Sequence, residues 1–132
     1  MAAMELVRVP KLTQDVPYAY AAVSAGGTVY AAGACPLDEA GEVVAPGDVP
    51  AQAGQVMRNL EEALREAGCG LGDVLKTTVY VASSERDDLV AAWDVVRAAF
   101  GDHDAPSTLL GVTVLGYPGQ LVEVESVAVR RA

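Results

Sequence analysis

Two carboxylates and one thiol stand where they could act on a small substrate. Glu123 and Glu125 alternate with Val122 and Val124 near the end of the chain. In a strand, this alternation places both carboxylates on one face, where a glutamate can act as a general base on a water within hydrogen-bond reach. The alternative interpretation is a solvated strand face. Cys35 is a candidate nucleophile if a nearby donor lowers the pKa of its thiol, and otherwise an inert core residue.

The remaining residue types argue against metal and cofactor chemistry. Cys35 and Cys69 lie far apart and form no CxxC pair, and the single histidine, His103, stands in an Asp-His-Asp loop that is typical of a solvated surface. Zinc sites need more such ligands at closer spacing. We therefore expect reduced thiols, no metal and no cofactor.

The elements that must position these residues follow from the hydrophobic periodicity and the turn residues. The length of 132 residues suits one domain, covering residues 1–132. The pattern predicts strands at 20–25 and 28–32, a helix at 49–67, a strand at 74–81, a helix at 88–100 capped by Ser84, and strands at 107–115 and 120–129. This order predicts an α+β, two-layer domain with two helices on one face of a sheet. The other face would stay apolar and is best buried against another copy of the chain.

Charge and hydropathy disfavour two classes of partner. Nine basic against eighteen acidic residues give a net charge of −9, which repels phosphate backbones and anionic lipids. The first ten residues contain no basic n-region and no apolar run, and no segment approaches the roughly 20 apolar residues that cross a bilayer. We expect a cytoplasmic protein that binds neither nucleic acid nor membranes.

Five strings, in order along nearly the whole chain, resemble the RidA/YjgF family of imine and enamine deaminases. They are Pro17-Tyr18, the stretch from Tyr30 to Pro36, the helix from Gln52 to Leu60, the strand from Gly70 to Tyr80, and the strand from Leu121 to Ala128. The resemblance implies a mixed, chorismate-mutase-like sheet and a homotrimer with active sites in the clefts between subunits.

The same resemblance implies roles for individual residues. Glu123 falls on the family's water-activating glutamate, Tyr18 on its pocket tyrosine and Gly33 on its glycine turn. Cys35 follows that turn, next to the expected pocket. Tyr117, in the turn before the last strand, either covers the cleft of a neighbouring subunit or fills its own loop.

Two positions depart from the family's pattern. Ser107 falls where the family has the arginine of a Pro-Ala-Arg-Ser string, which pairs with the substrate carboxylate. A shift of one residue places Pro106 there instead, and no arginine lies between Arg97 and Arg130. Trp93 stands where deaminase members carry asparagine, so it would narrow or reshape a cleft that it faces.

These features together predict a trimeric Rid-like hydrolase that acts on an imine, enamine or related electrophile. Without the arginine, only backbone and hydroxyl donors such as that of Ser107 could pair with a carboxylate, and these are weaker than a charge-assisted fork. The substrate is therefore expected to lack the usual α-carboxylate. The alternative is a non-catalytic ligand-binding or chaperone-like trimer, and a ribonuclease is disfavoured by the acidic charge.

Overall fold

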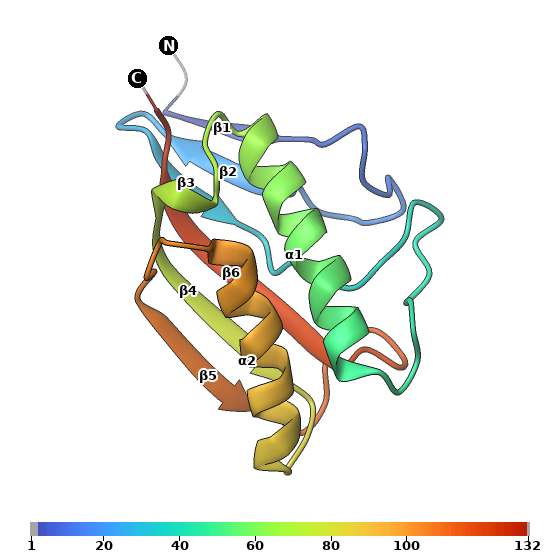
Figure 1. Cartoon of the computed structure of the whole chain (residues 1–132). Helices are drawn as coiled ribbons and strands as arrows, with labels where there is room; N and C mark the ends of the chain where they lie inside the picture. Colours follow the sequence, from blue (N-terminus) through green and yellow to red (C-terminus); the bar gives the residue numbers. More distant parts are fainter. Residues whose placement is uncertain (1–2, 132) are drawn as a thin grey trace.

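A six-stranded sheet with two long helices on one of its faces forms the protein (Figure 1). The computed structural model describes residues 3–131. In chain order the elements are β1 (Met4–Val7), β2 (Ala21–Ser24), β3 (Thr28–Ala31), α1 (Val49–Glu66), the 3-10 turn η1 (Leu71–Asp73), β4 (Val74–Val81), α2 (Arg86–Phe100), β5 (Ser107–Gly111) and β6 (Val122–Val129). The predicted α+β class, with both helices on one face, is confirmed.

The sheet is mixed, and its last strand in the sequence lies near its middle. The strand order is β1-β2-β3-β6-β4-β5, in which β4 and β5 are parallel and the other neighbours are antiparallel. In the β4–β6 register Glu123 stands opposite Tyr80. An isolated bridge between Ala34 and Val124 continues the line of β3 past its end, so the residues after β3 reach the start of β6.

Helix α1 forms where the periodicity predicts it. Asp48 caps its first turn by accepting a hydrogen bond from the backbone amide of Ala51 at 3.0 Å, with Pro50 beside the cap. Its inward face places Val56, Leu60 and Leu64 in the core, where they are fully buried. The chain leaves the helix immediately before Gly68, which has a φ of 93°.

Helix α2 starts two residues earlier than predicted, and the predicted cap is wrong. Glu85 occupies the cap position and makes no side-chain cap hydrogen bond. The hydroxyl that organises this turn belongs to Ser83, one residue before the predicted Ser84. It accepts from the Glu85 amide at 3.0 Å and donates to the Asp88 carboxylate at 2.6 Å.

The strand predictions hold except at the two edges of the sheet. The short edge strand β1 has no counterpart in the predicted pattern, because only Val7 among its four residues is buried and no alternation is visible. The other edge strand, β5, ends at Gly111 rather than at 115. The hairpin around Gly26-Gly27 and the strands β4 and β6 lie where they were expected.

Alternation along β6 divides the sheet into a helix-covered face and an open face. Val122, Val124 and Ala128 are fully buried under the helices, whereas Glu123 and Glu125 point to the opposite face. Both carboxylates therefore share one face, as the sequence predicts. The open face also exposes apolar side chains, among them Tyr30, Leu110 and Val129 at 56%, 43% and 42%.

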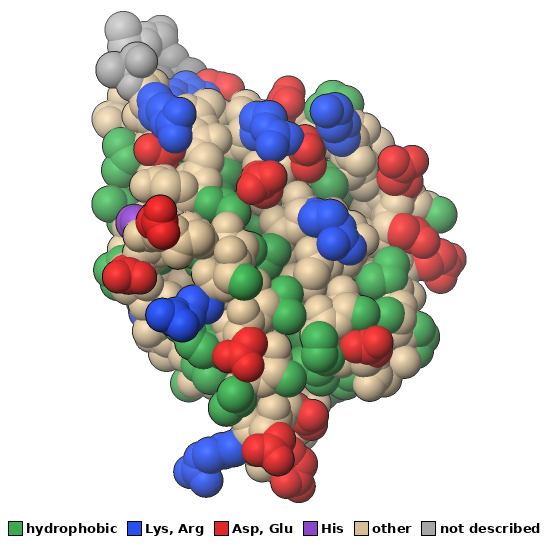
Figure 2. All heavy atoms as spheres, viewed as in Figure 1, with side chains coloured by type: hydrophobic (Ala, Val, Ile, Leu, Met, Phe, Trp, Pro, Cys, Tyr) green, Lys and Arg blue, Asp and Glu red, His purple; other side chains and the backbone are tan. Residues whose placement is uncertain are grey.

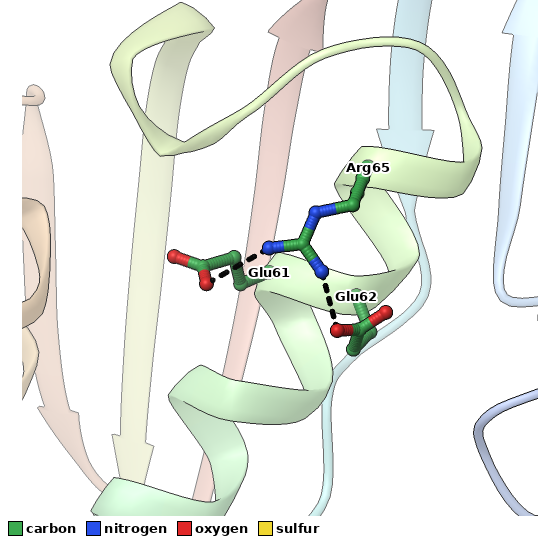
Figure 3. A network of polar contacts seen from close by, with 3 residues as sticks. All are labelled: Glu61, Glu62 and Arg65. Carbon is green, nitrogen blue, oxygen red and sulfur yellow. Dashed lines mark hydrogen bonds and ion pairs between the residues drawn. The ribbon is translucent and has the colours of Figure 1, made fainter.

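The helix-covered side of the molecule carries acidic and basic side chains in a mixed pattern (Figure 2). A typical group lies on α1, where the guanidinium of Arg65 reaches both Glu61, at 3.3 Å, and Glu62 (Figure 3). Exposed pairs one helical turn apart each stabilise a helix by only about 0.3 to 0.5 kcal/mol. This group is therefore part of a solvated helix surface. Among residues 3–131, no helix is long and apolar enough to cross a membrane.

Candidate functional site

The carboxylate of Glu123 lies against the backbone of Gly33 on the open side of the sheet. The bridge between Ala34 and Val124, with backbone hydrogen bonds of 2.7 and 3.2 Å, brings the segment after β3 across the start of β6. A Cβ atom placed on Gly33 would stand 2.0 Å from Oε2 of Glu123 and 2.8 Å from its Cδ. The carboxylate therefore occupies space that any other residue at position 33 would fill.

One oxygen of this carboxylate is held and the other is free. Oε1 accepts a hydrogen bond from Nε2 of Gln120 at 3.0 Å and a weak one from the thiol of Cys35 at 3.5 Å. Within residues 3–131, no hydrogen bond engages Oε2. A carboxylate in this arrangement has one oxygen available to accept a proton from a bound water.

Cys35 is held in its protonated form. Burial, followed by the negative charge of Glu123 and the hydrogen bond to it, raises the pKa of the thiol to about 12. A nucleophilic cysteine needs the opposite environment, in which positive charge or donors stabilise the thiolate. At neutral pH the thiol of Cys35 therefore keeps its proton, and its two acceptors, Oε1 of Glu123 and the carbonyl of Gly33, each lie 3.5 Å from the sulfur.

Two tyrosines form the aromatic wall of the site. The hydroxyls of Tyr18 and Tyr117 are hydrogen-bonded to each other at 3.1 Å, although 99 positions separate them in the chain. Burial and this hydrogen bond raise the pKa of Tyr18, so its phenol stays neutral. Tyr18 also packs edge-on against Tyr20, whose hydroxyl is anchored on the carbonyl of Thr13.

These side chains surround one wide, shallow hollow of about 580 Å³. It is lined by Pro17, Tyr18, Ala32, Gly33, Cys35, Gly116, Tyr117 and Glu123. Five of the seven predicted site residues thus meet in one place. The lining contains aromatic, small and thiol side chains and one carboxylate, with no lysine or arginine.

The other two predicted residues lie elsewhere in this chain. Ser107 starts the edge strand β5 opposite Thr77, whereas Glu123 stands opposite Tyr80, three residues further along β4. The hydroxyl of Ser107 donates to the carbonyl of Ala105 at 2.7 Å. Trp93 lies on α2 and packs against the core on the helix-covered side of the sheet. A single copy of the chain therefore does not bring Ser107 or Trp93 to Glu123.

Two buried glutamines that no sequence pattern singles out support the loop before β6. Gln120 is 3% exposed and Gln52, on α1, is fully buried. The carboxamide of Gln52 accepts from the Leu121 amide at 2.7 Å and donates to the Gly119 carbonyl at 3.0 Å. A glutamine beside a turn is usually solvated, and only its place just before an apolar strand could have indicated otherwise.

The remaining candidate, His103, is remote from this hollow. Its Nε2 lies 2.8 Å from the carbonyl of Val74, and its ring packs edge-on against Phe100. Within the described part of the chain, no three His, Cys, Asp or Glu side chains are grouped as ligands of one metal ion.

A family model, known proteins and solved structures match this chain over most of its length. The family model described as Endoribonuclease L-PSP matches residues 10–130. A RutC family protein of Pyrococcus abyssi is 32% identical over 128 residues, covering 96% of this chain and 97% of that protein. The 2-iminobutanoate/2-iminopropanoate deaminase of Escherichia coli is 34% identical over 112 residues, 83% of this chain and 84% of the deaminase. The solved structure of the Escherichia coli YjgF gene product matches with a TM-score of 0.81 and 30% identity, covering 96% of this chain and 99% of that one.

Proposed function

Because the chain belongs to the endoribonuclease L-PSP family, which includes the RidA/YjgF deaminases, we propose that it hydrolyses a carboxylate-free imine or enamine with Glu123 as general base. The observation that carries this proposal is the Glu123 carboxylate, which has one oxygen held by Gln120 and the other free in a hollow lined by tyrosines.

In the proposed reaction, water adds across the carbon–nitrogen double bond. Oε2 of Glu123 accepts a proton from the water as the water oxygen bonds to the imine carbon, and the same proton then passes to the imine nitrogen, which gives a neutral tetrahedral carbinolamine. Glu123 next accepts the hydroxyl proton of the carbinolamine and transfers it to the nitrogen as the carbon–nitrogen bond breaks. The carbonyl forms, ammonia leaves with both protons of the water, and Glu123 is again a carboxylate. An enamine enters the same route after protonation at carbon gives its imine.

The composition of the hollow supports a substrate without a carboxylate. Its lining residues include no basic side chain, and the nearest charge is the carboxylate of Glu123 itself. A substrate carboxylate here would face like charge with no guanidinium to pair with it. A neutral or protonated imine meets no such repulsion, and the tyrosine faces favour a cation.

The open shape of the hollow supports a site completed by neighbouring copies in a homotrimer. The exposed apolar side chains on the open face of the sheet, such as Tyr30 and Leu110, are of the kind that an interface covers. A neighbouring copy is then the source of Ser107 for the cleft, since Ser107 does not reach Glu123 within one chain, whereas Trp93 packs against the core of its own chain.

The test is hydrolysis of an imine that carries no carboxylate. A flavin-dependent amine oxidase acting on benzylamine releases such an imine, and the decay of the imine is followed by absorbance with and without the protein. Glu123→Gln should lower the enzymatic rate by about a hundredfold or more, since a general base contributes about 10² to 10⁴. Glu125→Gln is the matched control on the same strand face, and its effect should stay within severalfold.

Two other outcomes would replace this proposal. Saturable binding of the imine's stable amine or ketone analogues, without turnover of any imine, would identify a non-catalytic binding protein. Cleavage of RNA that persists through repeated purification would identify a ribonuclease, although the charge of −9 opposes binding to a polyanion.

A further inference from the structure

We infer that Gln120 is a positioning residue for Glu123, because its carboxamide fixes which carboxylate oxygen faces the hollow and ties that orientation to the loop that carries Tyr117. This inference rests on the proposed function in one respect, namely that Glu123 is the base. Gln120 itself is absent from the lining of the hollow.

The side-chain carboxamide of Gln120 makes three hydrogen bonds to this loop and to β6. Its Nε2 donates to Oε1 of Glu123 at 3.0 Å and to the carbonyl of Val122 at 3.1 Å, and its Oε1 accepts from the amide of Tyr117 at 3.2 Å. A flipped amide would direct its oxygen at two acceptors and its NH₂ at a donor. The network therefore permits one orientation only.

This fixed donor decides how the carboxylate of Glu123 is placed. The only other group that donates to the carboxylate within residues 3–131 is the thiol of Cys35, which is a weak donor at 3.5 Å. Without the amide of Gln120, the thiol alone would have to hold Oε1 in place. The carboxylate of Glu123 could then rotate about the Cγ–Cδ bond, and Oε2 would no longer be held against Gly33.

The same residue couples the base to the wall of the hollow. The backbone amide of Gln120 donates to the carbonyl of Tyr117 at 3.0 Å, so backbone and side chain together close the turn from 117 to 120. Tyr117 in turn bonds to Tyr18. A shift of the tyrosine wall is therefore transmitted to Glu123 through a buried side chain.

Gln52 provides a matched control, because it supports the same loop without touching the carboxylate. It binds the backbone of Gly119 and Leu121 from α1, and it is as deeply buried as Gln120. Substitution by methionine, which has a similar volume and no amide, tests each glutamine in the same way. A purely structural role for Gln120 predicts the same kinetic outcome for both variants.

The experiment compares Gln120→Met with Gln52→Met in stability and in imine hydrolysis. Both variants should unfold at a lower temperature than the unmodified protein. Gln120→Met should lower kcat by about 10- to 100-fold, since a misplacement near 1 Å can cost about a hundredfold, while KM changes by less than threefold. Gln52→Met should keep kcat within about threefold. Equal kcat losses in the two variants, or an unchanged kcat in Gln120→Met, would overturn the inference.

A crystal structure of the Gln120→Met variant separates this inference from the proposed function. We expect the Glu123 carboxylate to leave its position against Gly33 or to occupy more than one conformer. An unchanged carboxylate would refute the positioning role even if the protein hydrolyses no imine. Should the methionine variant not fold, Gln120→Asn, which is shorter by one methylene, removes the same contact and is read in the same way.

Discussion

Substituting Gly33 by alanine should remove the activity at a modest cost in stability. The φ of Gly33 is not in the left-handed region, so the backbone accepts alanine and only the space for the new methyl group matters. That methyl group would stand 2.0 Å from Oε2 of Glu123, whereas ordinary contacts begin near 3.4 Å. The carboxylate must therefore withdraw by more than 1 Å, which is enough to reduce catalysis by about a hundredfold.

The stability cost follows from what the carboxylate leaves behind. Withdrawal breaks the hydrogen bonds from Gln120 and Cys35 to Oε1. Net contributions of hydrogen bonds to a charged group are about 1.5 to 3 kcal/mol, and rehydration of this partly buried side chain keeps the cost near the lower end. For a chain of this size, a loss of about 1 to 2 kcal/mol lowers Tm by about 4 to 8 °C.

The assay pairs thermal unfolding with imine hydrolysis for Gly33→Ala and for Gly72→Ala. Gly72 is a suitable control because its backbone is also compatible with alanine and, apart from its two chain neighbours, no residue of 3–131 has an atom within 4 Å of its added Cβ. A double-mutant cycle with Glu123→Ala completes the test, since that change deletes the atoms that the new methyl group meets. Gly33→Ala should cost almost no stability in that background. Additive costs, or a Gly33→Ala protein with full activity, would refute the reasoning.

Three further predictions concern the substrate, the thiol and the assembly. The protein should process 2-aminoacrylate at least about tenfold less efficiently than an arginine-bearing relative assayed beside it, because a lost charge-assisted contact weakens binding by about 1.5 to 3 kcal/mol. Ser107→Arg should recover part of the rate. Equal rates for the two unmodified proteins would contradict this prediction. In a Cys69→Ser background, iodoacetamide should alkylate Cys35 slowly at pH 8, because its thiol pKa of about 12 keeps it protonated; Glu123→Gln removes a charge that raises this pKa and should accelerate the reaction. Because folding raises the pKa of Cys35, the contribution of this thiol to the free energy of unfolding is fully present below about pH 8.5 and is lost as the pH rises towards 12. Light scattering at micromolar concentration should give the mass of a trimer, activity should fall when dilution dissociates it, and a monomeric mass would refute the trimer.

The sequence predicts most of the scaffold because local patterns determine it. The stripe of Val56, Leu60 and Leu64 predicts α1, the glycine pair at 26 and 27 predicts the hairpin, and the alternation from 122 to 125 correctly places both glutamates on one face. Strand β1 was missed because three of its four residues are exposed, so no period is visible. The spacing of Ser84 and Asp87 predicts a cap at Ser84, yet the turn uses the hydroxyl of Ser83 instead.

The site could be predicted only where the resemblance supplied positions. Tyr18, Gly33, Cys35, Tyr117 and Glu123 meet in one hollow, which no periodicity alone would indicate. The resemblance carries no information about residues specific to this chain, and the hydrogen bond from Gln120 to Glu123 is therefore visible only in three dimensions. The catalytic and binding roles assigned to these residues remain predictions for the experiments above.

The central place of β6 makes assembly of the sheet depend on the strand that is synthesised after all the other described strands. Strands β3 and β4 are not paired with each other, and each pairs with β6, so the sheet stays in two pieces until residues 122–129 have been synthesised. During translation, β3 and β4 each present an unpaired edge, which favours association with other chains. Premature termination before residue 122 should therefore yield insoluble fragments rather than a weakened domain. Because Glu123 lies on β6 itself, a chain without this strand lacks both the folded sheet and the proposed base.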